Sequence, residues 1–209
     1  GTGKLTAGAG WDNTGSVKVA EGELCLTSGN VIGTGAVTVD KDARLSGVTG
    51  TTALTNSSFT INGELVVGAF ANATSGKINF GGKNVTISST GKYVVGKGSY
   101  SNTTIENVNT LTINGTIEVV LASSYTPKDG DVLTLWTANH FAGTPNYVLP
   151  NLPLGMAWDM SKISEGKLTI VSDPTAIGVV PFGAKYGHND IYDLKGQLVR
   201  KNATSTEGL

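Results

Sequence analysis

The chain has 209 residues and a formal net charge of −1, and its 15 basic residues are spread along the sequence. Because a nucleic-acid surface needs clustered Lys and Arg, this distribution argues against a nucleic-acid partner. The 29 glycines have no three-residue period, which excludes collagen. They are also too many for a helical protein, since each Gly costs about 1 kcal/mol relative to Ala in a helix. No apolar stretch is long enough to span a bilayer. The composition predicts an all-β protein.

An alternating apolar pattern, interrupted by a short polar turn, recurs along the first part of the chain, in residues 15–26, 35–45, 59–67, 85–95 and 111–119. The second apolar residue of each copy is Val19, Val39, Ile61, Ile87 or Ile113. This spacing of about two dozen residues matches one turn of a β-solenoid. Alternation predicts that Val, Ile and Leu face inward as ladders, with Thr, Lys and Glu outward. The segments between copies, such as 48–58 and 68–76, are predicted to bulge as loops.

The turns leave a second fold open. Asn62-Gly63 and Asn114-Gly115 are strong signals for two-residue β-hairpins, and hairpins would build an antiparallel β-sandwich. We favour the solenoid because the period survives while the turn residues change. Since the chain starts at Gly1 in the middle of the pattern, we expect it to be part of a longer precursor.

The composition of the sequence changes after Val119, and most of the large aromatic and Pro residues lie in this later part. A solenoid needs a cap where its ladder and strand edges would otherwise be exposed. We expect Trp136, Phe141 and Trp158 to plug that end; a carbohydrate-stacking platform is the alternative interpretation of these rings. The predicted organisation is therefore β-helix repeats in 1–122, a C-terminal β cap in 123–172, and a linker with a β tail in 173–209.

One stretch, SSYTPKDGDVLTLWTANHFAGTPNYVLPNLPLGMAWDMSKISEGKLTIV (residues 123–171), resembles the end of an autotransporter-type passenger β-helix. Proteins of that family carry autotransporter-associated β-strand repeats. Their endings run from Tyr-Thr-Pro-x-x-Gly-Asp through a Leu-Pro-x-Gly-Leu-x-Trp-Asp-like segment to a Gly-x-Leu-x-Ile strand. Phe141-Ala142-Gly143 inverts the usual Gly/Phe turn. The resemblance covers residues 3–171 and implies a right-handed parallel β-helix that is exported to the cell surface or beyond.

The tail begins with a linker at residues 172–175, and residues 191–201 predict a strand, a tight turn and a second strand. This segment resembles the start of the C-terminal sorting domain of Bacteroidetes secreted proteins, with Gln197 in place of the usual Arg. The resemblance implies that the secretion machinery reads the tail. A plain terminal β-hairpin is the alternative.

Residues suited to chemistry are few and scattered. The acidic residues Glu21, Glu23, Asp40, Asp42 and Glu64 are predicted to be solvated in or beside turns, and not to stack on one face. Asp129 and Asp131 flank Gly130, a pattern that suits a turn better than a Ca²⁺ site. His140 and His188 lack metal-ligand spacing, and we expect His140 to be structural. The single Cys25 lies in a strand-like run and suits a core position better than a reactive thiol. We predict no catalytic residue, metal site or cofactor, and leave the ligand-binding residues unknown.

The sequence therefore favours a non-catalytic structural or adhesive stalk of a secreted or surface-attached bacterial protein, with a host or glycan surface as its ligand. Two alternatives remain. The chain could be the C-terminal part of a β-helix polysaccharide lyase or glycosidase whose active site lies upstream. It could also be a glycan-binding module that uses Trp11, Tyr93 and Tyr100 as exposed rings.

Overall fold

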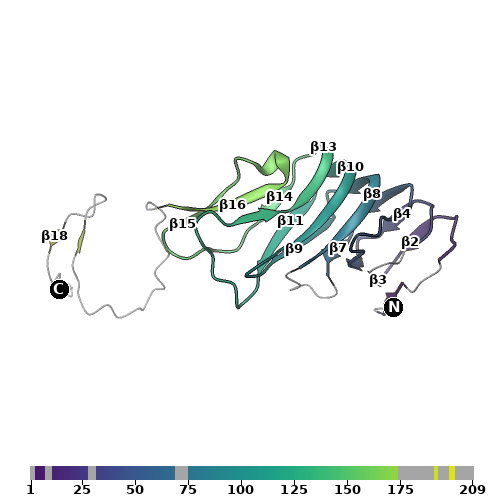
Figure 1. Ribbon diagram of the computed structural model, residues 1–209, viewed down its shortest axis with the longest axis horizontal. Helices are drawn as coiled ribbons and strands as arrows, with labels where there is room; N and C mark the ends of the chain where they lie inside the picture. The colour runs from purple at the N-terminus through teal and green to yellow at the C-terminus, as the bar shows by residue number, and fades with distance from the viewer. Residues whose placement is uncertain are drawn as a thin grey trace, which may run out of the picture. The chain divides into compact units, whose positions relative to one another are not determined.

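The computed structural model describes residues 3–7, 11–27, 32–68, 75–173, 191–192 and 198–200. The chain divides into two compact units, residues 1–176 and 177–209. In the first unit, two parallel sheets lie beside a small antiparallel sheet (Figure 1). The described residues include a single 3₁₀ turn, η1 (Ile163–Glu165), and no α-helix.

The two large sheets, here called sheet A and sheet B, are built from strands that alternate along the chain. Sheet A has the order β1 (Lys4–Thr6), β3 (Gly22–Leu26), β5 (Ala43–Gly47), β7 (Glu64–Val67), β9 (Lys92–Lys97), β11 (Thr116–Leu121) and β14 (Asn146–Val148). Sheet B has the order β2 (Val17–Val19), β4 (Val37–Val39), β6 (Ser58–Ile61), β8 (Gly76–Ile87), β10 (Thr103–Ile113) and β13 (Trp136–Ala142). A sheet B strand, a corner and the next sheet A strand make one rung.

Every pairing within these two sheets is parallel. This stacking of rungs is a parallel β-helix, which confirms the predicted fold class. The antiparallel β-sandwich is excluded because β6 and β7, which Asn62-Gly63 joins, lie in different sheets. The same holds for β10 and β11 around Asn114-Gly115.

The interior of the coil consists of in-register apolar ladders. On sheet B, one ladder joins the five residues that define the sequence repeat, Val19, Val39, Ile61, Ile87 and Ile113. The facing ladder on sheet A consists of Leu24, Leu45, Leu65, Tyr93 and Ile117. All ten residues are buried. Since full burial of one such side chain contributes about 1.5–3 kcal/mol, these ladders are a main source of stability.

The corner glycines serve the stacking of rungs. A Cβ on Gly63 would meet the backbone oxygens of Asp40 and Ala43, in the preceding rung. A Cβ on Gly115 would meet those of Ser88 and Gly91. Neither glycine has the positive φ that a type I′ hairpin requires. The Asn-Gly pairs therefore mark places where two backbones approach closely.

The segment from residue 48 to 57 does not simply bulge outward, as the sequence analysis expected. Leu54 is buried in the core, and its backbone N–H donates to the Asn79 carbonyl at 2.8 Å. Asn56 is also buried, and its Nδ2 donates to the Gly35 carbonyl at 2.9 Å. Leu54 and Asn56 therefore pack inward, while Thr51, Thr55 and Ser57 of the same segment are exposed. Of the second predicted loop, residues 69–74 lie outside the described residues.

A different arrangement occupies the C-terminal end of the coil. Strands β12 (Val132–Thr134), β16 (Lys167–Ser172) and β15 (Met156–Asp159) form an antiparallel sheet in that order. The Trp136 ring is buried and stacks on Phe141 with centroids 4.7 Å apart. The parallel coil also extends into residues 123–172, since β13 and β14 continue sheets B and A.

The second unit contains one antiparallel pair, β17 (Ile191–Tyr192) with β18 (Leu198–Arg200). These strands lie where the sequence predicts a strand, a turn and a strand. The predicted turn, including Gln197, lies outside the described residues.

Candidate functional site

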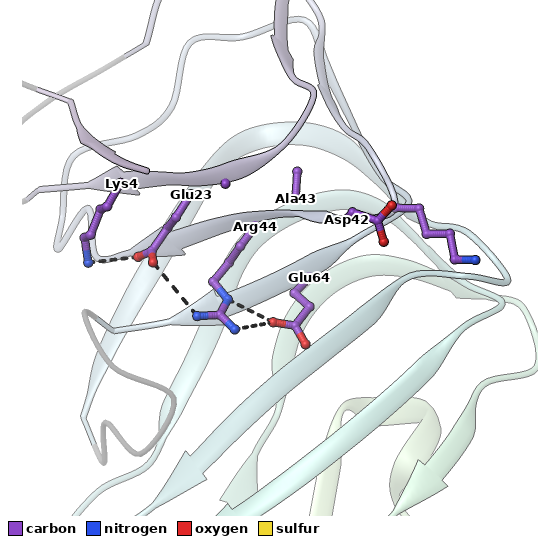
Figure 2. Close-up of a pocket in the computed structure, with 8 residues that line it drawn as sticks. Lys4, Glu23, Asp42, Ala43, Arg44 and Glu64 are labelled. Carbon is purple, nitrogen blue, oxygen red and sulfur yellow. Dashed lines mark hydrogen bonds and ion pairs between the residues drawn. The ribbon is translucent and has the colours of Figure 1, made fainter. Parts of the chain in front are cut away.

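A column of charged residues follows the corner on the outward surface of sheet A. Lys4, Glu23, Arg44, Glu64 and Lys92 are in register on consecutive strands β1, β3, β5, β7 and β9. Each is the residue before an inward ladder residue, so strand alternation directs its side chain outward. Figure 2 shows Lys4, Glu23, Arg44 and Glu64 lying in a row on neighbouring strands.

The charges in this column alternate in sign and form a continuous chain of ion pairs. Lys4 Nζ lies 2.8 Å from Glu23 Oε1, and Arg44 Nη1 lies 3.9 Å from Glu23 Oε2. Arg44 donates from Nε and Nη2 to Glu64 Oε2 at 2.8 and 2.6 Å. Lys92 Nζ lies 2.8 Å from Glu64 Oε1 and 3.2 Å from Glu118 Oε2, on β11. We call these six residues the charge ladder.

The cations hold the two inner carboxylates in their ionised form. Partial burial would raise the pKa of Glu23, but hydrogen bonds from Lys4 and Ser46 outweigh it and lower the pKa. Burial likewise opposes a low pKa at Glu64, and hydrogen bonds from Lys92 and Arg44 lower it. The hydrogen bond to Glu64 raises the pKa of Lys92. All three groups are therefore fixed as charged partners around neutral pH.

Glu23 and Glu64 are unsuited to act together as an acid–base pair. A glycosidase pair needs one carboxyl group with a raised pKa to act as the acid. Glu23 and Glu64 both have lowered pKa values, and Arg44 lies between them. A shallow hollow of about 400 Å³ lies beside the ladder, and its lining also includes Gly22, Lys41, Asp42 and Ala43. The basic and acidic side chains that line the hollow offset one another's charge.

For Glu23 and Glu64 the expectation of solvated acidic residues that share no face is wrong, whereas Glu21 and Asp42 are exposed as predicted. The Glu23 and Glu64 side chains are only 19% and 28% exposed, and they stack in one column. A signal was present in the sequence. When the repeats are aligned on their inward residues, the preceding position reads Glu, Arg, Glu and Lys. Each acidic residue lies beside a turn in the sequence, whereas its cationic partners lie on the neighbouring strands.

The other residues considered for chemistry are separated or engaged. Asp131 accepts hydrogen bonds from the Tyr125 hydroxyl at 2.6 Å and the Lys128 N–H at 2.9 Å, while Asp129 accepts one from the Ser172 N–H. Asp131 therefore closes the turn from Lys128, and Asp129 links that turn to the end of β16. Within the described ranges, no group of three or more His, Cys, Asp or Glu residues could hold a metal ion. Cys25 is a free thiol and is buried.

Only one of the two histidines lies in the part of the chain that the structure describes. His140 is exposed on β13, in register with Thr110, and a structural role for it stays a prediction. Its place on the outward side of a strand explains the exposure. His188 lies outside the described residues.

The rings named as glycan platforms lie in three different environments. The prediction that the Tyr93 ring is exposed is wrong. The ring is buried in the sheet A ladder, and its hydroxyl donates to the Leu135 carbonyl at 2.6 Å. Trp11 is partly buried against the core. Tyr100 is fully exposed and borders a hollow of about 470 Å³. Of the rings at the C-terminal end, the buried Trp136 has no surface for a sugar.

Trp158 also has a structural contact, since its Nε1 donates to the Pro150 carbonyl at 3.0 Å.

In the part of the chain that the structure describes, no helix has the length and hydropathy needed to cross a membrane. Comparisons of the chain with protein-family models, with curated proteins and with solved structures find no match.

Proposed function

We propose that this chain is a non-catalytic structural stalk of a secreted or surface-attached bacterial protein, which holds adhesive or catalytic parts away from the cell. The observation that carries the proposal is the uninterrupted stacking of rungs from β2 to β13. In such a coil each rung rests on its neighbours, so length can be added without a new core. A fold of this kind suits a spacer.

The charge ladder supports the same function. Its carboxylates are each bound by cations, and it runs along the stacking direction of the rungs. Pairs of this kind across parallel strands stabilise the stack and fix its register. The lowered pKa values of Glu23 and Glu64 suit ion pairing better than proton transfer. The surface location rests on the resemblance of residues 3–171 to autotransporter passengers, and of the tail to a sorting domain.

Two measurements test the proposal. On intact cells of the source bacterium, an antibody against the coil should label the surface, and added protease should remove the label. The purified chain should release no new reducing ends from acidic or neutral polysaccharides. Retention inside the cell, or turnover that Glu64→Gln abolishes, would contradict the proposed function.

Glycan binding is a second candidate because of one observation, the fully exposed ring of Tyr100. The ring borders a hollow whose other lining residues are mostly polar: Ser99, Ser124, Tyr125, Thr126, Lys128 and Asp131. An exposed aromatic face beside several hydroxyl groups can stack on a sugar ring and hydrogen-bond its substituents.

A glycan array probed with the purified chain and with Tyr100→Ala tests this candidate. Binding that the substitution abolishes would support it. Leu154→Ala is a matched control, since Leu154 is also an exposed apolar side chain. Equal loss in both variants, or a wild-type array without signal, would dismiss Tyr100 as a glycan platform.

A further inference from the structure

The two sheets do not end together at the N-terminal end of the coil. Sheet A begins with β1, whereas sheet B begins with β2, one rung later. From β2 to β11, every sheet A strand follows a sheet B strand of the same rung. Among the described residues, no sheet B strand accompanies β1. In the part of the chain that the structure describes, the rung of β1 thus consists of its sheet A strand alone.

A hollow lies between β1 and β2, with residues of both strands in its lining. It measures about 480 Å³, and its lining includes the apolar residues Leu5, Trp11, Val17, Val19 and Leu24. Leu5 belongs to the inward ladder of sheet A, in register with Leu24. Yet Leu5 is 58% exposed, whereas Leu24 is 3% exposed. The ladder residue of β1 thus lacks the cover that its equivalents have.

The edge of β2 retains hydrogen-bonding groups for a neighbouring strand. The Val17 N–H donates to the Ala36 carbonyl, and the Val19 carbonyl accepts from the Asp40 N–H, each at 2.9 Å. Both groups point toward β4. In a parallel strand, alternate residues bond to opposite sides, so the N–H and C=O of Lys18 point toward the outer edge of β2. Such an edge is a template for another strand.

We propose that the outer edge of β2 and the hollow beside Leu5 bind one parallel β-strand with an apolar–polar–apolar sequence, which completes the rung that β1 begins. Continuity with the existing sheet defines the occupant. The equivalent positions read Val-Lys-Val, Val-Thr-Val and Phe-Thr-Ile on β2, β4 and β6. The two apolar side chains fill the hollow, and the middle residue lies outward beside Lys18. Peptide recognition by strand addition works in this way.

The corner length permits the strand to be supplied on the same chain. In the rung that β2 and β3 form, three residues, Ala20 to Gly22, separate Val19 from Glu23. Three residues, Gly1 to Gly3, likewise precede Lys4. A strand attached directly before Gly1 therefore has a corner of a length already used in this coil. Tethering also gives it a high effective concentration.

The test fuses Ser-Ser-Phe-Thr-Ile, the sequence of residues 57–61, to Gly1. Relative to the parent chain, we expect a higher Tm, and amide exchange at Lys18 slower by about tenfold or more. The matched control carries Ser-Ser-Asn-Thr-Asn, which keeps the length but replaces both inward residues. It should behave as the parent chain does.

The measurements also identify other occupants. If both fusions leave Lys18 exchange and Tm unchanged, the proposal is overturned. A monomeric parent chain whose Lys18 amide is already protected would also overturn it, since the edge would then be covered by the chain itself. A parent dimer with a protected Lys18 that dissociation exposes would assign the edge to a second copy instead. None of these outcomes depends on the proposed stalk function.

Discussion

The apolar ladders stop at both ends of the coil, but the apolar residues at the two ends differ in how far they are buried. At the C-terminal end, the antiparallel sheet β12–β16–β15 supplies Leu133 and Leu168, which are fully buried. At the N-terminal end, Leu5 remains largely exposed beside a hollow. A stack of identical rungs cannot terminate itself, because each rung leaves an apolar interior and unpaired strand edges. A cap therefore has to differ in structure from the repeated rungs, as the antiparallel sheet does. An end that can accept a further rung has the same strand arrangement as the rungs before it.

The largest expected effect comes from breaking the covered end. Trp136→Ala removes a buried ring and its stacking contact with Phe141, and should lower the free energy of unfolding by about 3–5 kcal/mol. Leu5→Ala, at the opposite end, should cost less than about 0.5 kcal/mol because Leu5 is already exposed. Denaturant titration of both variants measures the contrast. Equal losses would mean that the ends are equally covered.

A pair of glycines gives the next effect. Gly166 has a φ of 75°, and an added Cβ would meet the backbone and ring of Trp136. Gly166→Ala should therefore cost about 2 kcal/mol. Gly3→Ala meets nothing within 4 Å, and should change stability by no more than about 0.5 kcal/mol. Thermal unfolding followed by circular dichroism compares the two. A neutral Gly166→Ala would show that this end tolerates movement.

A smaller effect is expected from the charge ladder, which lies between the two ends. Glu64→Lys places a cation between Arg44 and Lys92, and should destabilise the coil by about 1–2 kcal/mol. The matched control is Glu165→Lys, at an exposed ion pair with Lys167 near the C-terminal end, which should be almost neutral. Urea titration at low salt is the measurement. The ladder would be incidental if both reversals cost the same.

The smallest effect concerns pH. The pKa of Glu64 is lower in the folded state than its ordinary value of 4.5, because hydrogen bonds from Lys92 and Arg44 outweigh its partial burial. Its contribution to stability is therefore present above that value and is lost as pH falls through the folded pKa. Wild type should exceed Glu64→Gln by less than about 1 kcal/mol at neutral pH, with the difference vanishing in acid. A difference that grows toward acid would contradict this sign.

The repeat interval predicted the coil because its information is local and redundant. Val19, Val39, Ile61, Ile87 and Ile113 share a position in successive copies, and parallel stacking places them in one ladder. The hairpin alternative persisted because Asn62-Gly63 suits both folds. Only the backbone conformation separates a tight turn from a corner against the preceding rung.

The candidate site was harder to predict than the coil. The acidic residues lie beside turns in the sequence, and their cationic partners lie one rung away. Glu23 pairs with Arg44 on the adjacent strand, and Glu64 pairs with Lys92 in the same way. The exposure of the tyrosine rings was equally hard to predict, because Tyr93 and Tyr100 are the same residue type. They differ only in position: Tyr93 lies on β9 and is buried, whereas Tyr100 lies in a loop and is exposed.

The sequence by itself determined the all-β class, the rung length and the inward ladder, because alternation and period are properties of consecutive residues. The tertiary structure alone decided which outward charges meet, that Leu54 enters the core, and how each end of the coil is covered. Those outcomes depend on contacts between residues about twenty or more positions apart. Register between strands, and not the order of residues within one strand, brings such partners together.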